Sequence, residues 1–191
     1  MIAAEQWEAP AHEWTTDDLD ALPEDGVRRE LIDGVLIVSP APSTSHQTLA
    51  GMLMATLAGS CPKEYVVTQG VEVRISPRRT FIPDLVVVDA FAASKHPRHY
   101  LPREVLLAGE IVSPSSQAFD RVLKPNLYAE AGIPFYWRIE LEPALAIHTC
   151  KLADPHYREL GTFAEDLATD EPWRMSFSVA RLLPEALRKQ G

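Results

Sequence analysis

Short apolar runs separated by polar turn residues recur along the whole chain, and they predict an α/β (α+β) protein with a mixed central sheet. Strands are expected where these runs alternate or are rich in β-branched residues: residues 28–32, 35–38, 65–67, 71–75, 85–89, 106–112, 135–139, 144–149 and 158–163. Helices are expected where leucines recur at helical spacing after a capping residue: residues 15–22, 43–58, 115–131 and part of the C-terminal segment.

Three local features refine this outline. Asp33-Gly34 lies between two apolar runs and predicts an N-terminal β-hairpin. Residues 92–102 are rich in polar and ring-bearing side chains and are expected to form a loop. Pro125 falls inside the helix predicted for residues 115–131, so that helix either kinks or begins later than Ser115 or Ser116.

Composition limits the possible classes of protein. A chain of 191 residues with 46% hydrophobic and 24% charged residues suits one domain, in which a C-terminal strand and helix form an extension. The net charge of −9 excludes a global basic field that would attract nucleic acid. Cys61 and Cys150 are isolated, which is typical of reduced thiols and predicts a cytoplasmic protein. No signal segment or membrane span is expected.

The chemistry-bearing feature is a pair of carboxylates in apolar strands. Pro83-Asp84 opens the run 85–88, and Glu110 interrupts the run 106–112. Such carboxylates are costly unless a cation meets them, and paired strands would bring them to one sheet edge. Oxygen ligands suit Mg²⁺ or Mn²⁺ rather than zinc, and such an ion supports phosphodiester cleavage. Lys124, on the next predicted helix, would stabilise developing negative charge or help to deprotonate the attacking water.

Each of these residues is also compatible with a structural role. Asp84 after a proline is typical of a turn. A buried glutamate at position 110 is also explained by an ion pair with one of three cations: Arg74, Arg103 or Lys124. Lys124 is equally compatible with a solvated helix position paired with Asp120 at four-residue spacing. Glu30 fits an exposed cross-strand pair as well as it fits a site.

Taken in order, these residues resemble a known family. Pro83-Asp84, Glu110 and Lys124 resemble the PD-(D/E)xK nuclease pattern, and the chain is similar to the Uma-two family of restriction endonucleases. The resemblance covers about residues 14–150 and rests on these motifs: Glu30-Leu31-Ile32-Asp33-Gly34, His46, Pro83-Asp84-Leu85-Val86-Val87-Val88, Glu110-Ile111-Val112-Ser113-Pro114-Ser115-Ser116, Asp120, Lys124, Tyr128 and Gly132-Ile133-Pro134-Phe135-Tyr136-Trp137.

The resemblance implies a restriction-endonuclease-like fold, with a mixed sheet of about four core strands flanked by helices. It implies Asp84, Glu110 and the carbonyl of Ile111 as ligands of Mg²⁺ or Mn²⁺, with Glu30 as an assisting carboxylate. The superfamily often carries a lysine two residues after the glutamate, where this chain has Val112. In this family the lysine has moved to the next helix, so the resemblance assigns its role to Lys124.

The leading hypothesis is therefore a metal-dependent endonuclease acting on nucleic acid, most simply DNA, as a homodimer with no membrane association. Positive residues are expected to offset the acidic charge at its cleft: Arg74, Arg78, Arg79, Arg98, Arg103 and Lys124. His46 is interpreted as a capping or surface residue. A catalytically silent binding or assembly module and a hydrolase of small phosphoesters are the alternatives. If Asp84, Glu110 and Lys124 do not converge in space, both enzyme hypotheses fail. If they converge, plasmid cleavage with Mg²⁺ or Mn²⁺, compared with Asp84→Ala, separates a nuclease from a scaffold.

Overall fold

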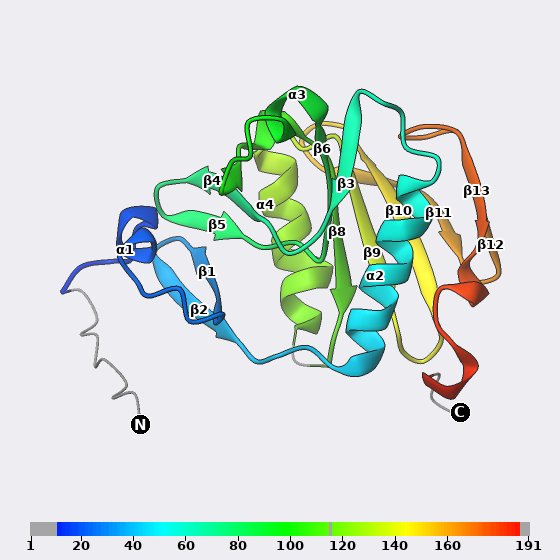
Figure 1. The fold of residues 1–191 in the computed structure, drawn as a ribbon, viewed down its shortest axis with the longest axis horizontal. Coiled ribbons are helices and arrows are strands. Elements are labelled where there is room, and N and C mark those ends of the chain that lie inside the picture. Colours follow the sequence, from blue (N-terminus) through cyan, green and yellow to red (C-terminus); the bar gives the residue numbers. More distant parts are fainter. Residues whose placement is uncertain (1–10, 115, 188–191) are drawn as a thin grey trace.

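The computed structural model describes residues 11–114 and 116–187, and its centre is a six-stranded mixed sheet (Figure 1). The strand order is β11-β10-β9-β8-β6-β3. Neighbouring strands pair antiparallel except β8 and β9, which run parallel. The bounds are β3 (Tyr65–Thr68), β6 (Leu85–Asp89), β8 (Val105–Val112), β9 (Phe135–Glu140), β10 (Ala146–Leu152) and β11 (Tyr157–Phe163).

A second sheet of five short strands has the order β2-β1-β5-β4-β7. Its strands are β1 (Arg28–Ile32), β2 (Val35–Ser39), β4 (Glu72–Ser76), β5 (Arg79–Phe81) and β7 (His99–Tyr100). The predicted β1–β2 hairpin is confirmed, and Asp33 and Gly34 have φ values of 51° and 82°. These positive values suit the tight turn that an Asp-Gly pair favours.

Helices flank the sheets, and they are short apart from one. They are α1 (Thr16–Asp20), α2 (Thr44–Ala58), α3 (Ala90–Ala93) and α4 (Lys124–Glu130), with a π-helical turn at Phe119–Leu123 directly before α4 and a 3₁₀ turn at Pro102–Glu104. Ser43 caps α2, and its hydroxyl accepts a hydrogen bond from the N–H of His46.

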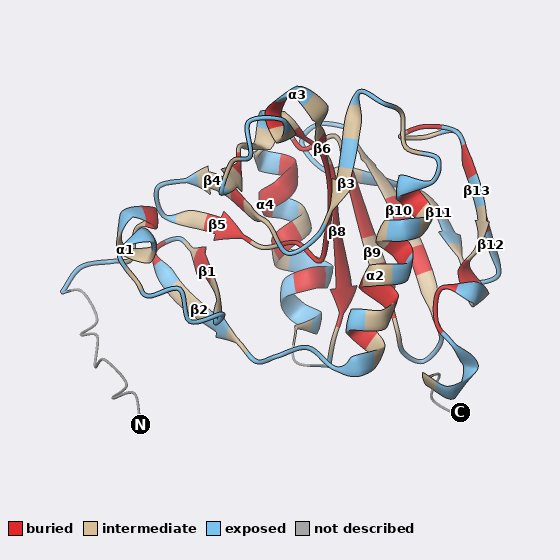
Figure 2. Cartoon of the chain, in the orientation of Figure 1, coloured by how far each residue is buried: buried red, intermediate tan, exposed pale blue. Residues whose placement is uncertain are grey.

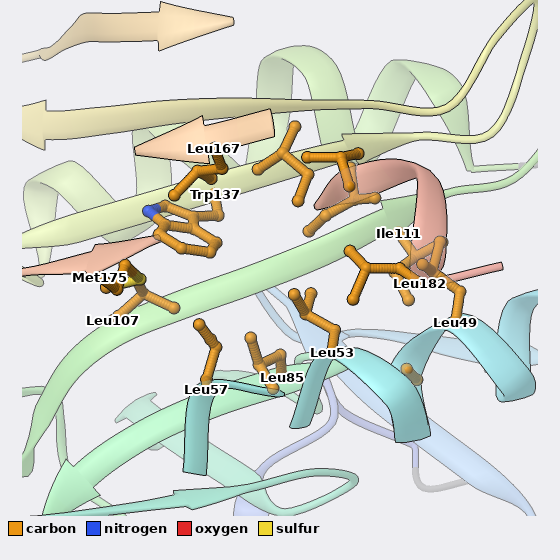
Figure 3. Close-up of a cluster of buried hydrophobic side chains, with 14 of the residues drawn as sticks. Leu49, Leu53, Leu57, Leu85, Leu107, Ile111, Trp137, Leu167, Met175 and Leu182 are labelled. Carbon is orange, nitrogen blue, oxygen red and sulfur yellow. The ribbon is translucent and has the colours of Figure 1, made fainter. Parts of the chain in front are cut away.

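Two cores cover opposite faces of the six-stranded sheet, because successive strand residues point to opposite sides. On one face, Leu49, Leu53 and Leu57 of α2 pack with Leu85 and other buried side chains (Figure 3). On the other face, residues of α4 and the second sheet pack against Val86, Val88 and Ala108. The residues of α2, β6 and β8 that form these two cores are accordingly buried (Figure 2).

The C-terminal segment completes the α2-side core. The hairpin β12 (Asp166–Thr169) and β13 (Met175–Ser178) contributes Leu167 and Met175 to it. The expectation of a terminal helix is wrong for the described residues, which form two 3₁₀ turns at Val179–Arg181 and Glu185–Leu187. The physical reason is that Leu182 and Leu183 are buried between these turns, and Pro184 opposes a continuous helix.

The predicted mixed α+β fold is confirmed, with two differences in detail. The central sheet has six strands rather than about four. The expected loop at 92–102 contains the end of α3 and the short strand β7. Ser115, one of the two predicted helix starts, lies outside the described residues. Among the described helices, none has the length and apolar character needed to cross a membrane.

Candidate active site

Strand geometry brings the two predicted carboxylates together. Asp84 lies immediately before β6, and Leu85 pairs with Gly109 of β8, one residue before Glu110. This approach is tight, because a Cβ on Gly109 would lie 3.3 Å from the Cβ of Leu85. Asp84 Oδ2 then accepts a hydrogen bond of 2.9 Å from the backbone N–H of Ile111. The start of β6 is thereby fixed against the C-terminal end of β8, the strand that carries Glu110.

Glu110 points to the face of the sheet that α4 covers, and it is only 1% exposed. Lys124 Nζ lies 3.1 Å from Glu110 Oε1. The hydroxyl of Tyr128, one turn further along α4, donates to the same oxygen at 2.7 Å. Lys124 is therefore a buried partner of the glutamate, and the alternative of a solvated helix position is wrong.

Lys124 connects three carboxylates in one buried cluster. Besides Glu110, its Nζ lies 3.3 Å from Glu30 Oε1 and 3.5 Å from Asp120 Oδ1. Glu30 comes from β1 of the second sheet, where its Oε1 accepts a 2.8 Å hydrogen bond from the N–H of Ile82. Elements far apart in the sequence thus deliver all four predicted residues, Glu30, Asp84, Glu110 and Lys124, to one site.

The π-helical turn explains how the chain accommodates Pro125. In a π-helix the carbonyl of residue i accepts from the N–H of residue i+5, and the N–H of Lys124 bonds to the carbonyl of Phe119 in this way. The next acceptor, the carbonyl of Asp120, would need the N–H that Pro125 lacks. The hydroxyl of Tyr136 donates to that carbonyl instead, at 2.5 Å. Helical residues begin at Gln117, directly after Ser116, and continue through the π-turn into α4. The interruption that Pro125 requires is therefore this π-turn rather than a later start of the helix.

Asp84 is bound by cations and donors on both of its oxygens. Arg28 Nη1 donates to Oδ1 at 2.8 Å, and His46 Nε2 lies 3.1 Å from Oδ2. Arg28 also donates to the carbonyl of Ile82. His46 is 8% exposed, so the interpretation of this residue as a surface position is wrong. His46 lies one turn before Leu49 on α2, so the buried face of this helix extends to the site.

The surroundings of these groups lower the pKa of Asp84 but raise the pKa of Glu110 and of Lys124. Burial alone would raise the pKa of Asp84, but the His46 hydrogen bond and the Arg28 charge hold it well below its ordinary value. Burial raises the pKa of Glu110, and the charge of Lys124 opposes this only partly. Burial would lower the pKa of Lys124, but Glu110, Glu30 and Asp120 together raise it. Lys124 is therefore a fixed positive charge.

The cluster lies in a cleft of about 800 Å³. Within residues 11–114 and 116–187, the arginines and lysines that line this cleft are Arg28, Arg121 and Lys124. The expectation that other arginines offset the acidic charge there is wrong for Arg74, Arg78, Arg79, Arg98 and Arg103, none of which lines it. Four of these instead form ion pairs elsewhere, such as Arg74 with Asp20 and Glu72. Their positions in turns and short strands put them near other acidic side chains.

Comparison with known proteins decides the family. The family model Uma2, described as "Putative restriction endonuclease", matches residues 16–179. The chain belongs to the Uma2 family. A crystal structure described as a "putative nuclease belonging to DUF820" from Anabaena variabilis has a similar fold, with a TM-score of 0.67 and 19% sequence identity. The match covers 88% of this chain and 96% of that chain. No curated protein matches the chain.

The donor set of this Uma2 chain fits a hard divalent cation. Four buried carboxylates (Glu30, Asp84, Glu110 and Asp120) face only two permanently charged partners, Arg28 and Lys124. A divalent ion would supply the missing positive charge, and carboxylate oxygens are the ligands that Mg²⁺ and Mn²⁺ prefer. In the described residues the carboxylates bind cationic side chains and do not form a ready-made cage of three or more ligands. Metal binding therefore requires rotation of these side chains.

The backbone of Ile111 also fits its predicted role. The N–H of Ile111 points toward Asp84, and the N–H and C=O of one strand residue face the same edge. The carbonyl of Ile111 thus faces the edge of β8 that pairs with β6, two residues beyond the last paired position, Gly109.

Sequence reasoning assigned no site role to four residues that belong to this Uma2 site: Arg28, His46, Asp120 and Tyr128. Asp120 lies four residues before Lys124 and Tyr128 four residues after it. Residues at this spacing share one helix face, and this was the signal in the sequence that they lie near Lys124. Arg28 alternates with Glu30 on β1, and two residues apart on a strand share a face. For His46 the signal was its helical spacing from Leu49, which placed it on the buried side of α2.

Proposed function

We propose that this protein is a metal-dependent endonuclease that hydrolyses phosphodiester bonds of nucleic acid, with DNA as its substrate. The observation that carries this proposal is the convergence of Glu30, Asp84, Glu110 and Lys124 at the base of one cleft. Membership of a restriction-endonuclease family and the fold shared with a nuclease-type structure support it. A purely structural ion pair between Glu110 and Lys124 would not need Glu30, Asp84 and Asp120 beside it.

Asp84, Glu110 and the carbonyl of Ile111 would hold Mg²⁺ or Mn²⁺, and Glu30 would add a carboxylate from the second sheet. An ion held there polarises a phosphoryl oxygen and favours ionisation of the attacking water. The protein's own residues position these ligands. Arg28 and His46 keep Asp84 ionised and oriented, and the Tyr128 hydroxyl fixes one oxygen of Glu110.

Lys124 would orient the attacking water and stabilise the negative charge that develops on the phosphoryl oxygens. Its raised pKa argues against a role as general base, because a lysine that stays protonated has no free electron pair to accept a proton. The sequence suggested two roles for Lys124, stabilising developing negative charge or helping to deprotonate the attacking water. The raised pKa favours the first.

A homodimer in the cytoplasm is part of the proposal, since two copies would present two clefts to the two strands of a duplex. The acidic net charge of −9 supports local rather than general attraction of DNA. Phosphate contacts at the cleft would weaken as salt rises.

Cleavage of supercoiled plasmid with Mg²⁺ or Mn²⁺ tests the proposal, comparing wild type with Asp84→Ala. Asp170→Ala is the matched control, because Asp170 is about 90% exposed and lies outside the cleft. We expect nicked and linear products from wild type and the control, and none from Asp84→Ala or in EDTA. Equal cleavage by wild type and Asp84→Ala would refute the catalytic assignment. No cleavage by wild type with either metal would favour the silent binding module.

A further inference from the structure

A second cavity, of about 410 Å³, adjoins the Asp84 end of the active site. It shares Arg28, Pro42 and Asp84 with the main cleft, so the Arg28–Asp84 pair lies where the two cavities meet. The remaining lining residues are Gly26, Val27, Gln47, Ala50, Gln69, Gly70 and Ile82. The proposed reaction at the main cleft assigns no role to them.

Strand register and helix position both place this cavity beside the reacting centre. β3 pairs antiparallel with β6, and its last pair joins Thr68 to Val86. Continuing this register by two residues brings Gly70 level with Asp84. On the helix side, Gln47 directly follows His46, whose ring binds Asp84. Gln47 and Gln69 therefore flank Asp84 from two different elements.

The chemistry of the cavity differs from that of the main cleft. Among the described residues that line it, the charged ones are Arg28 and Asp84, which bind each other. Gln47 and Gln69 are exposed, and their side-chain amides make no hydrogen bond within the described part of the chain. Gly26 and Gly70 have φ values of +75° and +64°, and each has open space where a Cβ would lie. The backbone there can approach a ligand closely.

This combination suits a nucleobase rather than a phosphate. A phosphate site needs free cations or oriented N–H groups, and the cation among the described lining residues, Arg28, is already paired with Asp84. The two glutamines line the same cavity, and their amides offer both donors and acceptors. A glutamine pairs well with the N6 and N7 atoms of adenine. Val27, Ala50 and Ile82 add an apolar surface of the kind that a base plane covers.

We propose that the second cavity is a base-recognition subsite, in which Gln47 and Gln69 bind the edge of an adenine next to the phosphate held at the Asp84 end of the cleft. This inference rests on the proposed function. It makes the two glutamines specificity-determining residues and gives the enzyme a base preference beside the cut.

Binding of fluorescently labelled oligo(dA), oligo(dC) and oligo(dT), measured by anisotropy in EDTA at low salt, tests the subsite without cleavage. We expect wild type to prefer oligo(dA) by roughly tenfold. The double variant Gln47→Met, Gln69→Met should bind all three within about a factor of two. Asn126→Leu is the matched control, because it removes an exposed amide of α4 that lines neither cavity.

The outcomes separate this inference from the proposed function. Equal affinities in wild type, an unchanged preference in the double variant, or no binding at all would each overturn the base subsite. Plasmid cleavage that needs Asp84 but shows no base preference at its cut ends would overturn the subsite alone. Base-dependent binding without any cleavage would overturn the nuclease assignment and leave the subsite standing.

Discussion

Replacing Lys124 with methionine removes the cation that lies within 3.5 Å of three buried carboxylates. Breaking a buried ion pair from one side typically costs 3–5 kcal/mol, because the remaining charge is left without a partner. Burial already raises the pKa of Glu110, so that carboxyl takes up a proton in the variant and limits the loss. We therefore expect the free energy of unfolding to fall by about 3 kcal/mol.

For a chain of this size, a loss of about 3 kcal/mol lowers the melting temperature by roughly 6–12 °C. Thermal unfolding in EDTA, followed by circular dichroism, measures this shift. Lys151→Met is the matched control, since Lys151 Nζ lies 2.8 Å from Glu171 Oε1 but both side chains are about 40% exposed. An exposed pair of this kind contributes at most about 1 kcal/mol.

The same variant tests whether the carboxylates can hold a metal. Without the lysine, a divalent cation has less competition for Glu30, Glu110 and Asp120. Mn²⁺ should therefore raise the melting temperature of Lys124→Met more than that of wild type, while cleavage stays lost. A melting temperature within 2 °C of wild type in EDTA would refute the charge argument. Equal stabilisation of both proteins by Mn²⁺ would refute a metal site at these carboxylates.

Further predictions concern acidity and the π-helical turn. Glu110→Gln should abolish cleavage yet raise the free energy of unfolding by about 1 kcal/mol, measured by urea denaturation, because a costly buried carboxylate is removed. The pKa of Asp84 is lower in the folded than in the unfolded state, so its contribution to stability is present above about pH 4 and lost at lower pH. Stability measured from pH 7 to pH 3 should thus fall less steeply for Asp84→Asn than for wild type. Tyr136→Phe should cost about 1–3 kcal/mol by leaving the Asp120 carbonyl unsatisfied. In a Pro125→Ala background the restored N–H should reduce that cost, and equal costs in both backgrounds would contradict this account of the turn.

Local signals explain why much of the fold could be predicted from the sequence. An Asp-Gly turn, a serine cap and leucines at helical spacing act over a few residues, and the structure confirms the β1–β2 hairpin and α2. The strand that follows Asp84 and the strand that carries Glu110 were also predictable, because each coincides with a run of mostly apolar residues. The C-terminal hairpin was not predictable in this way, since its apolar residues face a core built by distant elements.

The neighbours of the site required knowledge of the tertiary structure. Arg28 and Asp84 are 56 residues apart, and nothing local indicates that they pair. The net charge of the cleft also depends on which arginines reach it. Arg79, for example, binds Asp33 and Glu130 on the outer surface. A sequence count of arginines near a strand therefore overestimates the positive charge available to a substrate.

The position of Lys124 follows from the helix rather than from the strand. Val112 and Lys124 both line the cleft, so a cation from either element can approach Glu110. On the helix, Lys124 shares one face with Asp120 and Tyr128, which lie four residues to either side of it. This face delivers a cation, a carboxylate and a hydroxyl to the same buried site, which a single strand position cannot do. A search for a lysine two residues after the glutamate misses this arrangement. A search for Asp, Lys and Tyr at four-residue spacing after the glutamate strand finds it.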